Sequence, residues 1–571
     1  MRFAVKNLKE ICHYTLADNT LILQNEVLTY EVQGASALLR VEERAPGRTA
    51  PHLLFTVGMV DGHERRFGLW PDIPFVWMPS YQEECLLTLE GEHWGARTIM
   101  LYAFSDDYDT RTTENSYYMF ARNMPVLHGE IFFLEDMESD RAIVIVSEAP
   151  EYQETAVTVR HGAVQVQNGG YAISVGFCRR GECEAMCRAY YRHTCHRPSL
   201  LAMSNTWGDC NGYSRVCEEF VLREIDMAER LGVDIVQIDD GWQTGCTGDP
   251  AILDENRRRC FRGNFWEPSA EKFPHGMRYV TDYAAARGVR VGMWFAPDSH
   301  DHFALLERDK TILRRAYEEW GIRFFKLDMF WIHDRIDCDK MRELLAEVYA
   351  FGDDVDVQLD VTRDPRLKYL CGHEYGTVFV ENRYTKSGNA YPHRVLRNLW
   401  MLGRYLPTDK FQFELINPAL NQESYSAGDP FAPSRYTIDY LFATVMLANP
   451  LFWMEMQFLS AEQQETLVPL IQIWQQCRAD FVGKDVLPIG DLPNGRAFSG
   501  FVVNEGGRAT YLLLFREVTV EDTVTFRAPV KTGSRAVVLS SNGDVSLTVE
   551  DGAVRATFSS PRCYAFIKLT P

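Results

Sequence analysis

The chain has 571 residues, of which 46% are hydrophobic and 24% are charged, and its formal net charge is −20. This length is too great for a single hydrophobic core, so we expect two or three domains. The acidic balance argues against nucleic acid and against an anionic membrane surface as partners. The longest apolar runs are shorter than the roughly 18 residues that a membrane-spanning helix needs.

The first residues, MRFAVKNLKEICHY, lack the apolar core of an export signal. We therefore expect a cytoplasmic protein whose 14 cysteines are free thiols. One group of cysteines and histidines raises zinc binding as an alternative, but its spacing is irregular and residues 182–193 have the pattern of an amphipathic helix. The group comprises Cys178, Cys183, Cys187, His193, Cys195 and His196. We expect no cofactor.

Short strand-like runs separated by turn residues fill residues 1–195 and predict an N-terminal β-sandwich domain. Examples are AIVIVSE and YAISVGF, with a turn at Asn168-Gly169-Gly170 between them. The same rhythm returns after the middle of the chain, in runs such as ATYLLLFRE and CYAFIKLT. Residues 484–571 are therefore predicted to form a small C-terminal β-sandwich domain.

Between residues 196 and 483, strand-like runs alternate with helical segments. Helical patterns at 217–232 and 309–321 each finish at a glycine, Gly232 and Gly321, as helix C-termini often do. Eight strands alternating with helices predict a (β/α)8 barrel. A doubly wound open sheet is the alternative, but no dinucleotide-binding glycine fingerprint follows the first strand. The strand-like runs are 200–207, 233–242, 289–298, 322–331, 355–364, 376–385, 411–418 and 448–456.

The run at 322–331, IRFFKLDMFW, combines apolar residues with a charged pair. Because side chains alternate along a strand, Lys326 and Asp328 share a face with Phe324, while Phe325 and Leu327 occupy the other face. An apolar face turns toward the surrounding helices, so the charged pair is expected to point into the barrel near the C-terminal end of the strand. Barrel enzymes carry their chemistry at that end. A core strand with one structural ion pair is the alternative.

The same alternation directs polar residues of other strands inward, so that five or six carboxylates converge on one end of the barrel. Carboxylates accept hydrogen bonds from the adjacent hydroxyls of a sugar, and indole faces pack against its C–H surface. A divalent-metal site, as in sugar isomerases, is the alternative use, although histidine is missing from the inward sets. The predicted substrate-binding residues are Asp239, Asp240, Trp242, Trp294, Asp298, Lys326, Asp360 and Arg383.

Glycoside hydrolysis requires two carboxyl groups beside the scissile bond, about 5–5.5 Å apart for retention and roughly 6.5–9.5 Å apart for inversion. Asp328 suits the nucleophile, because the nearby cation of Lys326 favours an ionised carboxylate. Glu381, with its apolar neighbours Phe379 and Val380, is the predicted acid/base residue. Asp360 is the rival for that role.

These motifs resemble glycoside hydrolase family 36, the α-galactosidase or melibiase-like enzymes. The resemblance implies a sandwich–barrel–sandwich fold and retaining, exo-acting α-galactosidase activity with Asp328 as the nucleophile. It also adds Asn205 and Trp207 to the predicted substrate site. The matching motifs are Asn205-Thr206-Trp207, Asp239-Asp240-Gly241-Trp242, Lys272-Phe273-Pro274-His275-Gly276, Gly292-Met293-Trp294-Phe295-Ala296-Pro297-Asp298 and Lys326-Leu327-Asp328-Met329.

The chain departs from the family pattern on the opposite wall, which makes it a divergent member. The fifth strand continues as residues 359–364 without the family's cysteine and glycine-rich run, and Val380-Glu381-Asn382 replaces the Ser-Asp that carries the acid/base. The expected partner is therefore an α-linked oligosaccharide or glycoside, with α-N-acetylgalactosaminide and β-L-arabinopyranoside as alternatives to α-galactoside. A non-hydrolytic carbohydrate-binding or transglycosylating barrel, and a homo-oligomer, also stay open.

Overall fold

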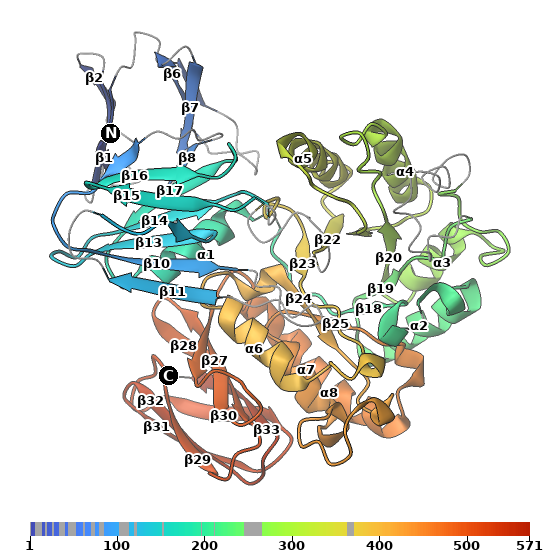
Figure 1. The fold of residues 1–571 in the computed structure, drawn as a ribbon. Coiled ribbons are helices and arrows are strands. Elements are labelled where there is room, and N and C mark those ends of the chain that lie inside the picture. The colour runs from blue at the N-terminus through green and yellow to red at the C-terminus, as the bar shows by residue number, and fades with distance from the viewer. Residues whose placement is uncertain are drawn as a thin grey trace.

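The computed structural model describes the strand backbones between residues 2 and 69, residue 73, and residues 75–78, 85–101, 113–118, 123–150, 153–195, 197–210, 212–244, 265–361 and 371–570. Figure 1 shows the β-rich N-terminal and C-terminal parts on one side of the molecule, and the part of alternating strands and helices on the other. No helix among the described residues is both long enough and apolar enough to cross a membrane.

The N-terminal part consists of antiparallel sheets, as predicted. One sheet of nine strands runs in the order β11 (Thr113–Tyr118), β10 (Trp94–Met100), β13 (Ile131–Asp136), β14 (Ala142–Ser147), β17 (Ile173–Cys178), β8 (Phe75–Met78), β7 (His63–Leu69), β6 (Leu53–Val60) and β5 (Arg40–Glu43). A four-stranded sheet contains β12 (Leu127–His128), β15 (Ala156–Arg160), β16 (Ala163–Gln167) and β9 (Cys85–Thr88). Another contains β1 (Arg2–Val5), β4 (Leu28–Gln33), β3 (Thr20–Gln24) and β2 (Tyr14–Ala17).

Helix α1 (Cys183–Thr194) follows β17 and corresponds to the amphipathic pattern predicted at 182–193. It packs against β14 and β17, and all six residues of each of these strands are buried. Cys178, Cys183, Cys187 and Cys195 are free thiols, and the first three are buried. His196, the last member of that group, lies outside the described residues.

The central part is a closed barrel in which all neighbouring strands are parallel, which confirms the predicted (β/α)8 fold. Its strands are β18 (Met203–Asn205), β19 (Ile235–Ile238), β20 (Arg290–Phe295), β21 (Phe324–Leu327), β22 (Asp356–Asp360), β23 (Thr377–Phe379), β24 (Phe411–Leu415) and β25 (Asn449–Phe452). Its helices are α2 (Glu218–Leu231), α3 (Met277–Ala285), α4 (Leu306–Glu318), α5 (Arg335–Tyr349), α6 (Pro392–Leu402), α7 (Ile438–Val445) and α8 (Ala461–Cys477).

Alternation along the strands divides the barrel interior into an apolar floor and a polar mouth. The floor is a cluster of buried side chains that includes Ile235 on β19, Phe324 on β21 and Leu451 on β25, with Trp453 just beyond β25. Along β19 and β21, the residues two and four positions further on are polar: Gln237 and Asp239 after Ile235, and Lys326 and Asp328 after Phe324. The lumen is thus closed by apolar packing near the start of the strands, and its polar groups gather at their C-terminal ends.

Local signals set the ends of two helices. Helix α2 ends at Gly232, which has φ of 82° and donates its backbone N–H to the carbonyl of Ala228 at 2.8 Å. A left-handed residue at this position favours glycine, so the predicted helix end is confirmed. Helix α8 begins with a capping box in which the side chains of Ser460 and Gln463 each accept from the backbone N–H of the other.

The C-terminal part is a two-sheet sandwich, as predicted. Its five-stranded sheet contains β26 (Asp485–Gly490), β27 (Phe498–Glu505), β28 (Arg508–Arg516), β33 (Cys563–Thr570) and β30 (Arg535–Ser541). Its three-stranded sheet contains β29 (Thr523–Arg527), β32 (Ala553–Phe558) and β31 (Val545–Glu550). A separate apolar cluster that includes Leu514, Phe526 and Ile567 packs between them.

An ion-pair cluster connects the first helix to the C-terminal part. Asp485, the first residue of β26, accepts from Arg188 Nε at 3.2 Å and from Arg192 Nη2 at 2.7 Å, and both arginines lie on α1. Burial opposes ionisation of Asp485, but the two guanidinium groups lower its pKa below the ordinary value. The aspartate is thus held in its charged form between two parts of the chain that lie far apart in sequence.

We predict that Asp485→Asn lowers the free energy of unfolding by about 2 kcal/mol near neutral pH, the scale of hydrogen bonds to a charged group. Because the pKa of Asp485 is lowered in the folded protein, its contribution is present above about pH 4, the ordinary range of an aspartate, and is lost as the pH falls through the lowered value. Denaturation curves at several pH values measure this difference.

Asp226→Asn is the matched control, because Asp226 forms a more exposed pair with Arg287 at 2.8 Å. Such surface pairs contribute about 0–1 kcal/mol, so this variant should differ little from the parent protein. An Asp485→Asn protein no less stable than Asp226→Asn at pH 7 would contradict the prediction.

Candidate active site

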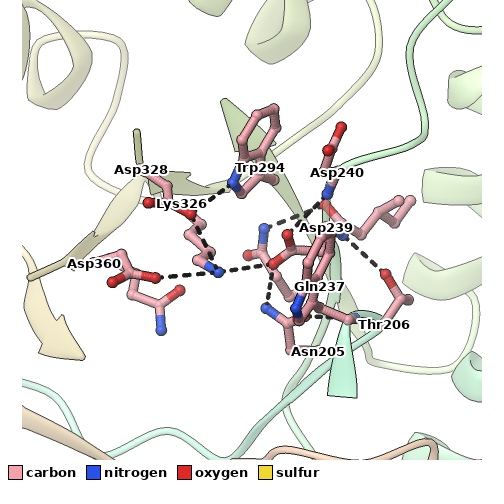
Figure 2. Close-up of polar contacts among 12 residues, drawn as sticks. Asn205, Thr206, Gln237, Asp239, Asp240, Trp294, Lys326, Asp328 and Asp360 are labelled. Atoms are coloured by element: carbon pink, nitrogen blue, oxygen red, sulfur yellow. Dashed lines mark hydrogen bonds and ion pairs between the residues drawn. The ribbon is translucent and has the colours of Figure 1, made fainter. Parts of the chain in front are cut away.

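A buried lysine lies at the centre of the polar mouth. Lys326 Nζ is 2.9 Å from Asp239 Oδ2, 3.5 Å from Asp360 Oδ2 and 3.9 Å from Asp328 Oδ2. These residues come from the ends of β19, β21 and β22, and Figure 2 shows them converging on the ammonium group. The predicted inward positions of all four residues are therefore brought together in the structure.

The lysine remains charged despite its burial. Removal from water by itself lowers the pKa of Lys326, but the negative charges of Asp239, Asp360 and Asp328 outweigh that effect and raise the pKa above its ordinary value. The ring of Trp453 adds a favourable face, with its centroid 5.4 Å from Nζ. The mouth thus contains one permanent cation shared by three carboxylates.

Asp328 is held in a fixed orientation by two donors. Trp294 Nε1 donates to Asp328 Oδ2 at 3.0 Å (Figure 2), and the backbone N–H of Met329 donates to Asp328 Oδ1 at 2.6 Å. Met329 has φ of 53°, a left-handed conformation that is strained for a residue with a Cβ and that is found at functional sites. The Asp328 side chain is 17% exposed, against 3% for Lys326 and for Asp239 and 5% for Asp360. Asp328 is therefore the member of this group most open to an incoming molecule.

Asp239 is fixed from the side of β18. Asn205 Nδ2 donates to Asp239 Oδ2 at 2.7 Å, and the backbone N–H of Asp239 donates to Thr206 Oγ1 at 2.9 Å. Asn205 Oδ1 in turn accepts from the backbone N–H of Trp207 at 2.8 Å. The predicted residues Asn205 and Asp239 are thus in direct contact, and the Asn-x-Trp sequence supports the aspartate.

Asp240 is a carboxyl group of the mouth whose pKa is raised. It is buried and its Oδ1 accepts from Gln243 Nε2 at 2.6 Å. Burial, together with the charges of Asp239 and Asp328, raises the pKa of Asp240 to about 7, although the Gln243 hydrogen bond acts in the opposite direction. Asp240 can therefore exchange a proton near neutral pH.

The predicted roles of two tryptophans are corrected by the structure. Trp242 is fully buried, donates from Nε1 to the carbonyl oxygen of Trp294 at 2.9 Å, and packs against Trp266 and Trp320. Gly241 before it has φ of 110°, which turns the chain away from the lumen. Trp294 is also buried and offers its N–H to Asp328 instead of a ring face to a sugar.

Trp207 lies at the mouth, as predicted, next to Tyr384, an aromatic residue that the alternation of side chains along the strands did not identify. Its indole Nε1 donates to the hydroxyl of Tyr384 at 3.1 Å, and both side chains are half-buried against the apolar floor. Tyr213, which is 39% exposed, packs near the same indole. Strand β23 ends at Phe379, so period-2 alternation no longer applies at Tyr384.

Glu381 and Arg383 form a buried ion-pair cluster. Arg383 Nη1 lies 2.7 Å from Glu381 Oε2 and 3.7 Å from Glu414 Oε1, while Asn398 on α6 donates to Glu381 Oε1 at 2.6 Å. The side chains of Glu381 and Arg383 are 0% exposed. The burial of Arg383 therefore favours a structural role over the predicted substrate binding. Glu381 would have to leave these partners to reach a glycosidic oxygen.

Asp298 lies in the loop after β20, where its carboxylate serves local structure. Its Oδ1 is 2.8 Å from His300 Nδ1 and its Oδ2 is 3.9 Å from Arg308 Nη2. Near this loop, His302 contacts Asp337 at 2.8 Å and Asp334 at 3.5 Å, and these three residues form a group that could hold a metal ion. Asp334 also caps α5 by accepting from the N–H of Asp337, so this group has a structural explanation at the helix end.

The architecture is that of a barrel enzyme, with a set of carboxylates around one lysine at the carboxyl ends of the strands. A scan against protein-family models found no match. The α-galactosidase Mel36A of Lactobacillus acidophilus is 30% identical over 74 residues, which are 13% of this chain and 9% of that protein. The matched segment therefore spans less than a tenth of that relative's length.

Solved structures extend the similarity to nearly the whole chain. A family 36 α-galactosidase, a variant of AgaA from Geobacillus stearothermophilus in complex with 1-deoxygalactonojirimycin, matches with a TM-score of 0.67 and 10% identity over 94% of this chain and 87% of AgaA. Another AgaA variant, in complex with raffinose, matches with a TM-score of 0.65 at the same identity and coverage. The chain thus has the fold of family 36 α-galactosidases, and the predicted resemblance is confirmed.

We predict that Asp240→Asn stabilises the protein at neutral and alkaline pH. Because the pKa of Asp240 is raised in the folded state, ionisation destabilises the fold progressively as the pH rises from about 4, the ordinary value, to about 7. The asparagine keeps an acceptor for Gln243 without the charge, so the gain should reach up to about 4 kcal/mol above pH 7 and vanish near pH 4. Thermal unfolding across this pH range measures it.

Asp239→Asn is the neighbouring control with the opposite expected sign. Its ion pair with Lys326 is buried, and removing the charge of one partner of such a pair is strongly destabilising. If Asp240→Asn lowers the unfolding temperature at pH 8 as much as Asp239→Asn does, the proposed titration of Asp240 is wrong.

Proposed function

We propose that this protein is a retaining α-glycoside hydrolase, most simply an exo-acting α-galactosidase. The observation that carries the proposal is the arrangement of Asp328, the most exposed carboxylate of the mouth, oriented by Trp294 and placed 3.9 Å from Lys326. A nucleophile needs an ionised carboxylate and a fixed direction of attack. The neighbouring ammonium of Lys326 favours the first, and the two donors that orient the carboxylate favour the second. The fold shared with family 36 α-galactosidases supports the same reaction class.

In the proposed mechanism, Asp328 attacks the anomeric carbon while the bond from that carbon to the leaving oxygen breaks. A second carboxylic acid protonates the leaving oxygen. It then removes a proton from water, which displaces Asp328 from the glycosyl-enzyme and releases a sugar of retained configuration. Asp360 and Glu381 are the two candidates for the second group.

The remaining polar groups of the mouth suit a neutral sugar. Asp239 and Asp240 accept hydrogen bonds from hydroxyl groups, and Lys326 donates to a hydroxyl oxygen. Trp207 and Tyr384 are half-buried aromatic residues at the rim, suited to contact a sugar's C–H face. Because an AgaA variant was solved with raffinose, we propose α-galactosides of this kind as substrates, with α-N-acetylgalactosaminide and β-L-arabinopyranoside as the related alternatives.

We expect Asp328→Asn to lower the hydrolysis of an aryl α-galactoside by at least about a thousandfold, because no other group would form the covalent intermediate. The amide keeps the size of the side chain, so sugar binding should persist, which isothermal titration with galactose measures. In the parent protein, an activated 2-fluoro glycoside should label Asp328. Label on another residue would assign the nucleophile elsewhere.

The acid/base residue is distinguished by comparing Glu381→Gln with Asp360→Asn. Loss of the acid slows substrates with poor leaving groups far more than activated aryl glycosides, and azide restores turnover of the latter. We expect this pattern for the variant that lacks the acid/base residue. The loss of activity at alkaline pH, which reports deprotonation of that acid, should also disappear from its pH profile. The other variant should lower both substrate classes equally, because it disturbs only binding or stability.

One observation favours a second function. Since both carboxylate oxygens of Glu381 are engaged with buried partners, its proton-donating role requires a rearrangement that a barrel which only binds carbohydrate does not require. Water-dependent release of chromophore from aryl α-galactosides separates these possibilities. Binding without release would support the second function, whereas transfer to an added sugar in preference to water would indicate a transglycosylase, which needs the same acid/base residue as a hydrolase.

A further inference from the structure

A cavity of about 210 Å³ lies between the N-terminal sandwich and the barrel, separate from the mouth. Its walls come from β8, the residue after β14, the C-terminal end of α1, the middle of α5 and the segment 371–376 that precedes β23. Residues from two parts of the chain thus build one partly open site. The lining residues are Trp77, Glu148, Thr194, Arg342, His373, Glu374 and Tyr375.

The position of the cavity excludes it from the candidate active site. His373 and Glu374 come shortly before the N-terminal residue of β23, Thr377, whereas the mouth is built where the strands end. In a barrel of parallel strands these two levels lie at opposite ends. A molecule in this cavity would therefore not occupy the position next to Asp328.

Arg342 forms ion pairs with Glu148 and Glu374 at the wall of the cavity. Arg342 Nε donates to Glu374 Oε1 at 2.8 Å, and Arg342 Nη2 donates to Glu148 Oε2 at 3.2 Å. Glu148 Oε1 accepts from the hydroxyl of Tyr190 at 3.0 Å. Both oxygens of Glu148, and one oxygen of Glu374, therefore have protein donors.

The second carboxylate oxygen of Glu374 has no hydrogen-bond donor among the residues that the structure describes. Glu374 is 5% exposed, and within the described part of the chain its buried Oε2 atom accepts no hydrogen bond; His373 Nδ1 is 3.8 Å away. Burial opposes ionisation, but the charges of Arg342 and His373 and the Arg342 hydrogen bond lower the pKa of Glu374 to about 2. A buried charged acceptor without a donor destabilises the folded protein, so a ligand that supplies a donor to this oxygen would be stabilising.

The other groups that line the cavity indicate which kind of ligand it can bind. The guanidinium of Arg342 already bridges the two carboxylates, so a second cation next to it would be repelled. The pocket also contains the hydroxyl of Thr194, which is within 2.6 Å of His373 Nε2, and the half-buried indole of Trp77. Closely spaced polar groups beside an indole suit a neutral polyhydroxylated molecule, which offers donors, acceptors and an apolar C–H face.

We propose that this cavity is a second binding site for a neutral polyol of monosaccharide size, in which a ligand hydroxyl donates to Glu374 Oε2. Since its walls come from both the sandwich and the barrel, occupancy holds these two parts together and stabilises the folded chain, and this stabilisation grows with the logarithm of ligand concentration once the ligand exceeds its Kd. The site is independent of the hydrolytic activity proposed above.

Binding of D-galactose and of myo-inositol, measured by isothermal titration and by thermal unfolding, tests the proposal. The parent protein should bind one of these polyols at a site additional to the mouth. The Glu374→Gln variant should weaken that binding at least tenfold, because the amide N–H2 replaces the acceptor that the ligand needs. Hydrolysis of aryl glycosides by the Glu374→Gln single variant should be unchanged, so failure of this site and failure of the proposed activity are separable.

Glu224→Gln is the matched control, since Glu224 is also a buried carboxylate but its oxygens accept from Gln457 and from the N–H of Met456. It should lose stability without losing polyol affinity. Soaking crystals of the parent protein with galactose provides a test that needs no variant, and Trp77→Ala provides a second if Glu374→Gln fails to fold. An empty cavity after soaking, or equal polyol affinity with and without Glu374→Gln, overturns the proposal.

Discussion

The sharing of one buried ammonium group among three carboxylates is the interaction on which the mouth of the barrel depends. Asp239, Asp328 and Asp360 lie at the ends of three different strands, and mutual repulsion would separate them without Lys326 between them. Burial alone would favour a neutral lysine, so the carboxylates keep it charged while it keeps them together. Each charge is thus a condition for the burial of the others.

This arrangement needs support from the layers below and around it. The apolar floor around Phe324 and Leu451 excludes water from beneath the cluster and so strengthens the ion pairs above it. The strained backbone at Met329 turns an N–H toward Asp328, and packing of the barrel maintains that conformation. The stability of the scaffold therefore offsets the cost of a site that is unfavourable in isolation.

The sequence pattern predicted the fold and the centre of the site for one physical reason: alternation holds as long as a strand lasts. Lys326 lies within β21 and Asp360 ends β22, and both point inward as predicted. Strand β19 ends at Ile238 and β23 at Phe379, so Trp242 and Arg383 lie beyond the range of the rule. A positive φ at Gly241 and a buried pairing with Glu381 decide their positions, and both depend on tertiary contacts that a single sequence does not encode locally.

The excess of carboxyl groups over cations at the mouth also limits what can enter. Three carboxyl groups face the single ammonium of Lys326, and Asp240 adds another negative charge at alkaline pH. A uronic acid or a sugar phosphate would bring a further anion into a poorly hydrated space where like charges repel strongly. On the proposed function, the cluster that binds hydroxyl groups also acts as a charge filter, which separates uncharged glycosides from the acidic and phosphorylated sugars that share their shape.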